Sequence, residues 1–272
     1  MIMAIVTISR GTFSGGKAVA ETLAQRLGCP CVSREIILDA AKQYGISEQK
    51  LTAAIKEPPS FWQQVPEKRI AYLSFVTAAL LARAKQGNLV YHGHAGHLLL
   101  SGISHTIRAR VVADMEFRIK AAMEQRDLTR EEAIVAIEKV DKERVKWTRF
   151  LYGVEWQDPS LYDVVLNLEH VTVSGAAETL ARMTELPDFK PSAASQKAFD
   201  NLLLSSRVWA ELTRSEQTRG ASVRVQADNG KVTISGSAST ERALEAISKI
   251  AMRVEDVREV RSDVGIGKDW YW

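Results

Sequence analysis

The most informative segment of this chain is Gly11-Thr12-Phe13-Ser14-Gly15-Gly16-Lys17. It fits the pattern G-x-x-x-x-G-K and stands between an apolar run at residues 3–9 and a helical pattern at residues 17–27. Glycines let successive backbone N–H groups curl around a phosphate, and the N-terminus of a following helix adds free donors and a favourable dipole. This strand–loop–helix context predicts a phosphate-binding loop in preference to a glycine-rich turn that binds nothing.

The side chains of the loop refine this prediction. Lys17 carries a mobile positive charge suited to the β- and γ-phosphates of a nucleotide. Position 18 is alanine, where the full motif has the serine or threonine that holds magnesium. We predict that ATP or its phosphates contact the loop and the helix start, through Gly11, Thr12, Phe13, Ser14, Gly15, Gly16, Lys17 and Ala18.

The residues before position 186 alternate short β-rich runs with longer helical patterns, which is typical of an α/β fold with a parallel sheet. The expected strands are residues 3–9, 29–32, 88–92, 108–113 and 162–167. The expected helices are residues 17–27, 34–44, a long one within 66–86, 115–126 and 130–152. Thr129 and Glu132 have the S/T-x-x-E spacing of a capping box and mark the start of the last helix.

A second, smaller unit is predicted beyond residue 186. Residues 187–197 combine two prolines with small polar residues and read as a linker. A helical run follows at 198–213, then two alternating runs that flank Asp228-Asn229-Gly230, a strong hairpin signal. A helix at 240–254 and a strand at 258–266 complete an αββαβ unit. We therefore expect a first domain at 1–186, a small α+β domain at 198–267 and an aromatic tail at 268–272.

The composition excludes few classes of protein. The chain has 272 residues, with 36 basic and 33 acidic side chains and a net charge of +3, so we expect no nucleic-acid partner. The start, MIMAIVTIS, lacks the basic region of a secretory signal, and no apolar run reaches the 20 or so residues that span a bilayer. We expect a cytoplasmic protein in which Cys29 and Cys31 stay reduced, since cysteines this close make a poor disulfide.

Several segments together resemble the cytidylate-kinase-like group of nucleoside-monophosphate kinases. Ile8-Ser9-Arg10 followed by Ser14-Gly15-Gly16 is similar to the opening of these proteins, and RVVADMEFR at 110–118 is similar to a strand and the arginine-bearing helix after it. IEKVDKER at 137–144 with RFLYG at 149–153 resembles their helical lid, and YDVVLN at 162–167 their closing strand. The resemblance covers roughly residues 1–185 in family order.

This resemblance implies transfer of the γ-phosphoryl group of ATP, with Mg²⁺, to a nucleoside monophosphate or a similar small acceptor. Lys17, Arg144 and Arg149 would be the catalytic residues, two of them on the lid. Asp141 would orient Arg144, because side chains three residues apart touch on a helix. Arg118 would lie near the donor nucleotide. Without the resemblance, these arginines would be interpreted as a solvated helix face with surface ion pairs.

The chain departs from the family pattern at several positions. Phe13 stands where the family tends to have glycine, and Ala18 has no hydroxyl for magnesium. His94 stands where an arginine is expected to grip the acceptor phosphate, and Arg34 stands near the expected acidic start of the acceptor site. We predict that Arg34 and His94 contact the acceptor, although a histidine loses its charge near neutral pH.

Three histidines, His92, His94 and His97, lie within six residues. One interpretation is a metal site, because alternate residues of a strand share a face. A second places His94 at the carboxyl edge of a central strand, where ligands bind in such sheets. A third is a turn whose histidines are satisfied by hydrogen bonds. We favour the acceptor edge and predict no metal-binding residues in the chain.

Residues from about 200 to 267 resemble a BON domain, through Val223-Arg224-Val225, KVTISG at 231–236, the helix at 243–254 and Val257-Arg258-Glu259-Val260. The resemblance implies association with a membrane surface, a lipid or a protein partner, without catalysis. The aromatic tail suits such an interface or a fold-back onto the sheet.

Two other functions stay open beside the kinase. The first domain could bind ATP as a regulatory module that transfers nothing, which the residues at 13, 18 and 94 favour. The chain could also act as a lipid- or surface-binding adaptor through its BON-like domain.

Overall fold

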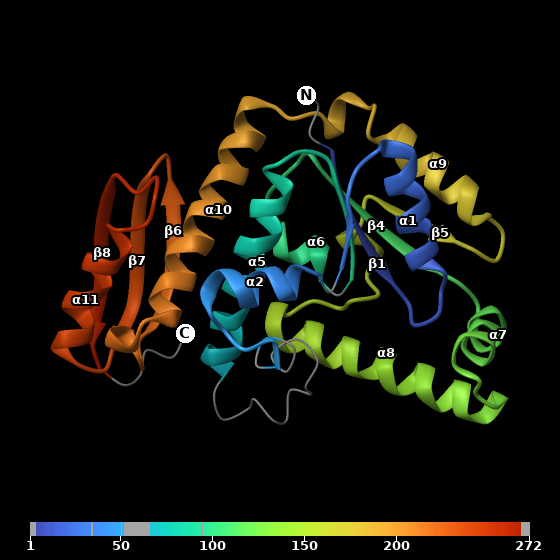
Figure 1. The fold of residues 1–272 in the computed structure, drawn as a ribbon, viewed down its shortest axis with the longest axis horizontal. Coiled ribbons are helices and arrows are strands. Elements are labelled where there is room, and N and C mark those ends of the chain that lie inside the picture. Colours follow the sequence, from blue (N-terminus) through green and yellow to red (C-terminus); the bar gives the residue numbers. More distant parts are fainter. Residues whose placement is uncertain (1–3, 34, 50, 52–65, 94, 268–272) are drawn as a thin grey trace. The chain divides into compact units, whose positions relative to one another are not determined.

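The computed structural model describes residues 4–33, 35–49, 51, 66–93 and 95–267, and Arg34, His94 and the tail at 268–272 lie outside this set. The described residues divide into two compact units (Figure 1). The first holds the described residues up to 33 and residues 83–192. The second holds residues 35–49, 51, 66–82 and 193–267.

The first unit is built on a five-stranded sheet in the order β2-β3-β1-β4-β5. All neighbouring strands are parallel, which confirms the predicted fold class. The strands are β1 (Ile5–Arg10), β2 (Cys31–Val32), β3 (Leu89–His92), β4 (Thr106–Val112) and β5 (Val164–Asn167). The central strand β1 ends at Arg10, so the loop that follows lies at the carboxyl edge of the sheet.

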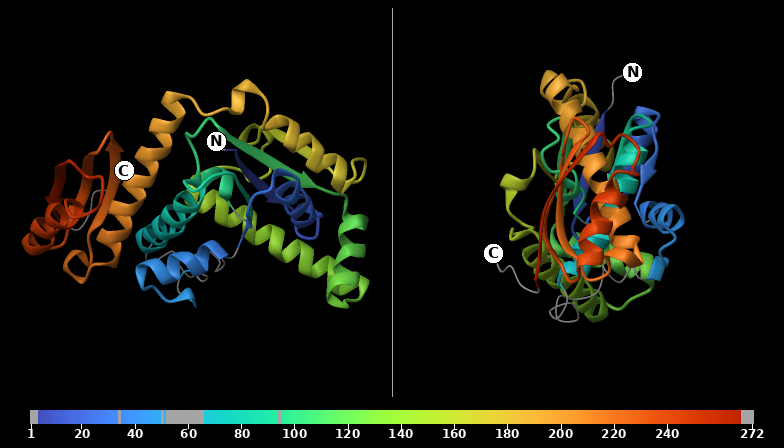
Figure 2. Two further views of the ribbon diagram at one scale, coloured as in Figure 1. Left: turned by 45° about the horizontal axis from the view of Figure 1, so that its top comes forward. Right: turned by 90° about the vertical axis from the view of Figure 1, so that its left-hand side faces the viewer.

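Helices α1 (Gly16–Leu27) and α9 (Val173–Met183) run side by side (Figure 1; Figure 2, left). They share an apolar core with the sheet, in which Val19 and Leu23 of α1 meet Ile8 of β1 and Leu180 of α9. All four side chains are fully buried or nearly so. This core anchors α1, so the loop between β1 and α1 is held at both ends.

Two further helices, α7 (Met115–Arg126) and α8 (Arg130–Tyr152), have the predicted bounds. The capping box forms as expected: Thr129 accepts from the N–H of Glu132, and the Glu132 carboxylate accepts from the N–H of Thr129. The two helices pack through a small apolar cluster that includes Ile119 and Ile137, and Phe13 of the glycine-rich loop packs against it. The loop is thereby joined to this helix pair.

Short elements complete the first unit: α6 (Gly96–Leu99) and the 3₁₀ turns η1 (Pro159–Leu161) and η2 (Pro187–Phe189). Neither α6 nor α9 was expected from the sequence. Helix α9 has a clear apolar face with the buried residues Ala176, Ala177 and Leu180, so its periodicity was a signal that the sequence prediction missed. In the part of the chain that the structure describes, no helix is long and apolar enough to cross a bilayer.

The second unit contains the predicted αββαβ arrangement. Its sheet has the order β6-β7-β8, made by β6 (Ser222–Asp228), β7 (Lys231–Ala238) and β8 (Glu259–Ile266). The β6–β7 pair is antiparallel, and its turn has positive φ at Asn229 (49°) and Gly230 (83°), as the Asn-Gly signal predicts. Helix α11 (Glu241–Ala251) begins after the Thr240 cap. The other elements are α2 (Glu35–Tyr44), α5 (Pro66–Ala84), α10 (Ala193–Arg214) and η3 (Glu216–Thr218).

Helix α10 begins at Ala193, inside the residues expected to form a linker. Ala193 and Ala194 favour helix more strongly than the neighbouring small polar residues oppose it. One stripe of α10, with Leu204 and Val208, belongs to the core of the C-terminal sheet. The helix also contacts α2. Residues from both halves of the sequence therefore build the second unit.

Candidate active site

The glycine-rich loop is fixed by hydrogen bonds to the sheet beside it. The N–H of Gly11 donates to the carbonyl of Val111 at 3.3 Å, and the Ser14 hydroxyl donates to the carbonyls of Gly11 (3.0 Å) and Val111 (3.1 Å). Gly15 has φ of 80°, and a Cβ at this residue would lie 2.6 Å from the side chain of Leu168. Glycine is therefore required at position 15 on grounds of both conformation and space.

Helix α1 starts directly behind this loop, at Gly16. The first N–H groups of a helix have no carbonyl partner within it and favour an anion. Lys17 in this first turn is 65% exposed, with its ammonium 3.6 Å from the Glu21 carboxylate, and Ala18 is exposed beside it. The N–H groups of Gly11, Thr12 and Ser14 have acceptors within the protein, so the donors for an anion come from the start of α1, beside a lysine that can turn toward a ligand.

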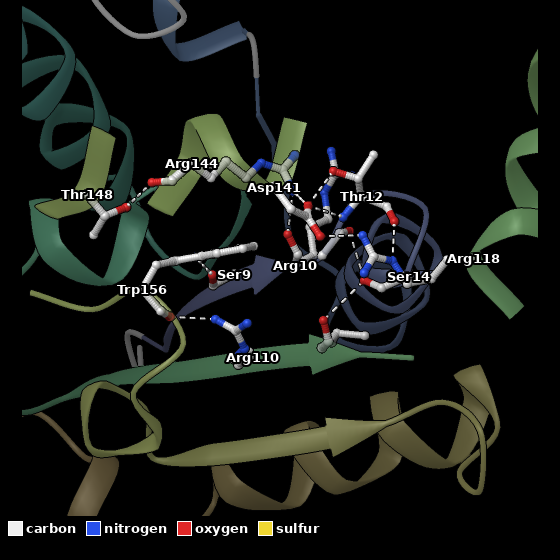
Figure 3. A network of polar contacts seen from close by, with 12 residues as sticks. Ser9, Arg10, Thr12, Ser14, Arg110, Arg118, Asp141, Arg144, Thr148 and Trp156 are labelled. Atoms are coloured by element: carbon white, nitrogen blue, oxygen red, sulfur yellow. Dashed lines mark hydrogen bonds and ion pairs between the residues drawn. The ribbon is translucent and has the colours of Figure 1, made fainter. Parts of the chain in front are cut away.

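Asp141 of α8 is the centre of a polar network above the loop (Figure 3). Its carboxylate accepts from the Thr12 hydroxyl at 2.7 Å and from the Thr12 N–H at 3.3 Å. Arg118 of α7 is ion-paired with Asp141 and also donates to the Thr12 carbonyl at 2.8 Å. Arg144 lies 3.6 Å from Asp141 and donates to the Arg10 carbonyl at 2.8 Å.

The predicted residues Thr12, Arg118, Asp141 and Arg144 are therefore brought together. Burial lowers the pKa of Arg144 to about 10, an effect that Asp141 opposes and that Arg10, Arg118 and a further arginine reinforce. At neutral pH the guanidinium is still charged. The repulsion among these arginines means that the site holds more positive than negative charge, and a bound anion would relieve it.

The further arginine, Arg110 of β4, was not predicted as a site residue. It is 7% exposed and donates to the Trp156 carbonyl at 2.5 Å and to the Tyr162 hydroxyl at 3.3 Å. Its guanidinium carbon lies 4.3 Å from the Trp156 ring centroid. The Trp156 indole N–H donates to the Ser9 hydroxyl at 2.9 Å. An arginine within the apolar run ARVVA was the available signal, because strand interiors seldom bury an unexplained charge.

A small cavity of about 80 Å³ lies between the loop and these side chains. It is lined by Gly11, Ser14, Arg110, Val112, Ala113, Arg118, Asp141, Trp156 and Gln157. Its walls thus come from the loop, from β4, from both helices of the α7–α8 pair and from the segment after α8.

Not every predicted residue joins this network. Arg149 is 65% exposed, and its guanidinium is ion-paired with Glu155 at 2.5 Å, near the end of α8. Arg34 and His94, the predicted acceptor contacts, lie outside the described residues. Among the residues that are described, no three histidine, cysteine or acidic side chains come together to hold a metal ion.

His97, in the short helix α6, is buried close to Arg108 and Arg110. It is 3% exposed, and its ring centroid lies 4.7 Å from that of Tyr162. Burial, with Arg110 and Arg108 nearby, lowers the pKa of His97 to about 4. The imidazole is therefore neutral at physiological pH and adds no charge to the site.

Comparisons with known proteins agree with this architecture. A model of the cytidylate kinase-like family matches residues 5–170, and a model of the BON domain matches residues 200–268. The cytidylate kinase of Ignicoccus hospitalis is 29% identical over 185 residues, which cover 66% of this chain and 99% of the relative. The cytidylate kinase of Staphylothermus marinus is 27% identical over 175 residues, covering 63% and 90%.

Among solved structures, an uncharacterized protein from Eubacterium ventriosum matches with a TM-score of 0.52 and 24% identity. The match covers 67% of this chain and 98% of that protein. At this identity the likeness concerns the fold alone. It spans about the same share of the chain as the sequence relatives do.

Proposed function

This chain belongs to the cytidylate kinase-like family through residues 5–170, and we propose that it transfers the γ-phosphoryl group of ATP to a nucleoside monophosphate or a similar small acceptor. The observation that carries the proposal is the surplus of positive charge beside the loop. Arg118 and Arg144 share one carboxylate, that of Asp141, and Arg110 lies opposite them. A site of this charge suits the phosphates of a nucleotide.

In the proposed reaction, an oxygen of the acceptor phosphate attacks the γ-phosphorus of ATP. A new P–O bond forms, the bond from the γ-phosphorus to the bridging oxygen breaks, and ADP leaves with that electron pair. The N–H groups at the start of α1 and Lys17 would hold the donor phosphates in line, while Arg144 and Arg118 would offset the charge that spreads over the transferring group. This route needs no covalent enzyme intermediate.

Magnesium would accompany ATP. The hydroxyls nearest the loop are engaged, that of Thr12 with Asp141 and that of Ser14 with backbone carbonyls, and Ala18 has none. The ion would therefore be held mainly by phosphate oxygens and waters, as Mg²⁺ often is in nucleotide sites. When bound, it would neutralise part of the charge of the donor phosphates. Because ATP is the donor, we propose a cytoplasmic location.

A loop that binds ATP without transfer is the main alternative. Phe13 is compatible with a working loop, because it adopts the left-handed conformation, with φ of 58°, that glycine would otherwise supply. A coupled ADP-release screen separates the two functions. We expect ADP release with at least one nucleoside monophosphate and little release without an acceptor. ATP binding with no release for any acceptor would leave only the regulatory module.

We propose that the BON domain serves as an interaction module. Residues 200–267 contain ten basic and ten acidic side chains, so they have no basic surplus to draw them to an anionic membrane. This balance favours a protein partner over the lipid adaptor. Co-sedimentation of residues 195–272 with phosphatidylserine vesicles tests the choice, and binding that salt abolishes would support the lipid function instead.

A further inference from the structure

Strand β8 forms one edge of the C-terminal sheet (Figure 1). Its eight residues pair in continuous register with β7, and in the part of the chain that the structure describes no strand lies on its other side. Proteins often protect an edge by a short strand, a proline or a bulge, and β8 has none of these. By contrast, the edge strands β2 and β5 of the first sheet are two and four residues long. At the other edge of the C-terminal sheet, β6 packs against α10, whose Lys197 is ion-paired with Asp228 at 2.7 Å.

The backbone of β8 presents hydrogen-bonding groups on this open side. The N–H groups of Glu259 and Gly267 donate to carbonyls at or beside the two ends of β7, at 3.3 and 3.2 Å, so the odd-numbered residues of β8 bond toward β7. Successive backbone groups along a strand point in opposite directions. The N–H and C=O groups of residues 260, 262 and 264 therefore point away from β7 and can pair with another strand.

The side chains of β8 differ between its two faces. Val260 and Val264 are half-buried and pack against the apolar core of the domain. Arg261 and Asp263 lie on the opposite face, with side chains 74% and 46% exposed, and Nε of Arg261 donates to the Asp263 carboxylate at 3.1 Å. The open edge thus carries apolar side chains on its core face and one charge of each sign on its exposed face.

The order of these residues makes β8 complementary to itself. Two antiparallel copies centred on Ser262 place Arg261 of each copy opposite Asp263 of the other, while Val260 faces Val264. The backbone groups of Ser262 point outward, so the Arg261–Asp263 pairs fall at the positions between hydrogen-bonded pairs, where Cα atoms approach to about 4.5 Å. Opposite charges stabilise such a pair and like charges destabilise it. The two neighbouring registers with the same backbone pairing place either Arg261 or Asp263 opposite its own copy.

We propose that β8 pairs with β8 of a second copy of this chain, antiparallel and centred on Ser262, so that the two C-terminal sheets join. Such an interface is isologous, because each residue makes the same contact in both copies. The proposal rests on the assignment of the C-terminal domain as an interaction module and names its partner. It does not depend on phosphoryl transfer.

The test measures the oligomeric state of the full-length protein by sedimentation equilibrium. Wild type should form dimers as its concentration rises. Arg261→Asp and Asp263→Arg should each raise the dissociation constant at least tenfold, because each puts two pairs of like charges at the interface. Mixed in equal amounts, the two variants should form a heterodimer with an affinity near that of wild type, since every pair then joins opposite charges. Arg224→Asp, on the exposed face of β6, is the matched control and should dimerise as wild type does.

A cross-link tests the register. Ser262→Cys brings two thiols to the centre of the interface, where Cα atoms about 5.5 Å apart are within reach of a disulfide. The two copies of Glu259→Cys would lie about 20 Å apart, because six residues of strand separate them. Mild oxidation should therefore link Ser262→Cys into a covalent dimer. It should leave Glu259→Cys at the level of wild type, whose own thiols are Cys29 and Cys31.

Three results would overturn the proposal. One is a wild type that stays monomeric up to about 1 mM, the dissociation constant of a very weak complex. Another is a dimer that Arg261→Asp leaves intact, or single variants that form no heterodimer when mixed. The third is a lower melting temperature of the single variants without any change in dimerisation, which would give Arg261 and Asp263 a structural role within one chain. Each of these would leave the interaction module with a different partner, and the vesicle assay above tests the module itself.

Discussion

Arg144 and Arg149 lie on the same helix and differ in what surrounds them. Arg144 is largely buried, contacts Asp141 and donates to the Arg10 carbonyl, whereas Arg149 is exposed and paired with Glu155. We expect Arg144→Ala to lower kcat at least tenfold with a smaller change in the KM for ATP, because its contact strengthens as charge spreads in the transition state. Arg149→Ala should stay within about threefold of wild type, since an exposed ion pair contributes under about 1 kcal/mol. Steady-state kinetics of the two variants measure this difference, and an equal loss of kcat in both would contradict it.

His97 makes a prediction about the pH dependence of stability. Its folded pKa, about 4, lies below the ordinary 6.5 because of burial and the nearby arginines. Below pH 6.5 the unfolded chain takes up a proton that the folded protein does not, so stability falls as the pH drops from 6.5 toward 4. The loss attributable to His97 is at most about 3 kcal/mol.

His97→Phe removes that titration and retains an aromatic ring, so its stability should fall less between pH 7 and pH 5 than that of wild type. Urea unfolding at the two pH values measures the difference. The matched control is His170→Phe, because His170 is 73% exposed. His105 is also buried with a lowered pKa and keeps some pH dependence in the variant. An identical loss in wild type and His97→Phe would show that His97 does not titrate as the structure indicates.

At the scale of elements, Phe13 links the loop to the α7–α8 pair. Its backbone has φ of 58°, a conformation that costs a residue with a side chain about 1–2 kcal/mol. Its ring packs against the Ile119–Ile137 cluster and lies 5.1 Å below the Arg126 guanidinium. Contact with this cluster offsets the strain of the backbone.

This balance predicts an unusual order of stability. Phe13→Ala loses the packing and keeps the strain, whereas Phe13→Gly loses the packing and relieves the strain. The glycine variant should therefore be more stable than the alanine variant, by about 1 kcal/mol, the reverse of the usual order in regular structure. Chemical denaturation of wild type and both variants measures it. An alanine variant more stable than the glycine variant would mean that the loop does not hold Phe13 at positive φ.

The elements whose bounds are marked by a short local sequence pattern could be predicted. The apolar run and glycines around Lys17 specify β1, the loop and α1, and Thr129 with Glu132 specifies the start of α8. Helix α9 was predictable, because it has a threonine cap at Thr172 and a clear apolar face, whereas the four-residue helix α6 was too short to leave a pattern. Arg110 could not be assigned because its partners Trp156 and Tyr162 lie 46 and 52 residues away along the chain. Local sequence does not specify such contacts.

At the scale of the whole chain, the boundaries 1–186, 187–197 and 198–267 remain a proposal. Helix α10 starts at Ala193 and contacts α2. Tyr44 of α2 is buried, and its ring packs at a tilt against that of Phe75, with 5.1 Å between the ring centroids. Burial raises the pKa of Tyr44 to about 12, and the charge of Arg207 on α10 acts to lower it. The second unit therefore includes residues that a sequence boundary assigns to the first domain.

A chain that ends at Pro187 tests these boundaries. We expect it to bind ATP as the full chain does, because the loop, Asp141 and the arginines all precede residue 187. It should melt at a lower temperature, since α2 loses its contact with α10. Calorimetric ATP titration and a melting curve measure both. A truncated chain that is folded and binds no ATP would show that the C-terminal domain completes the nucleotide site.

The most direct test of phosphoryl transfer follows the γ-phosphoryl group itself, with γ-labelled ATP and each nucleoside monophosphate in turn. Wild type should move the label into a nucleoside diphosphate, and Lys17→Ala should lose this activity. Lys249→Ala should keep it, because Lys249, like Lys17, is an exposed lysine paired with a glutamate four residues away at 3.6 Å. Label that stays in ATP, or that wild type releases only as inorganic phosphate with every acceptor, would contradict the proposed function.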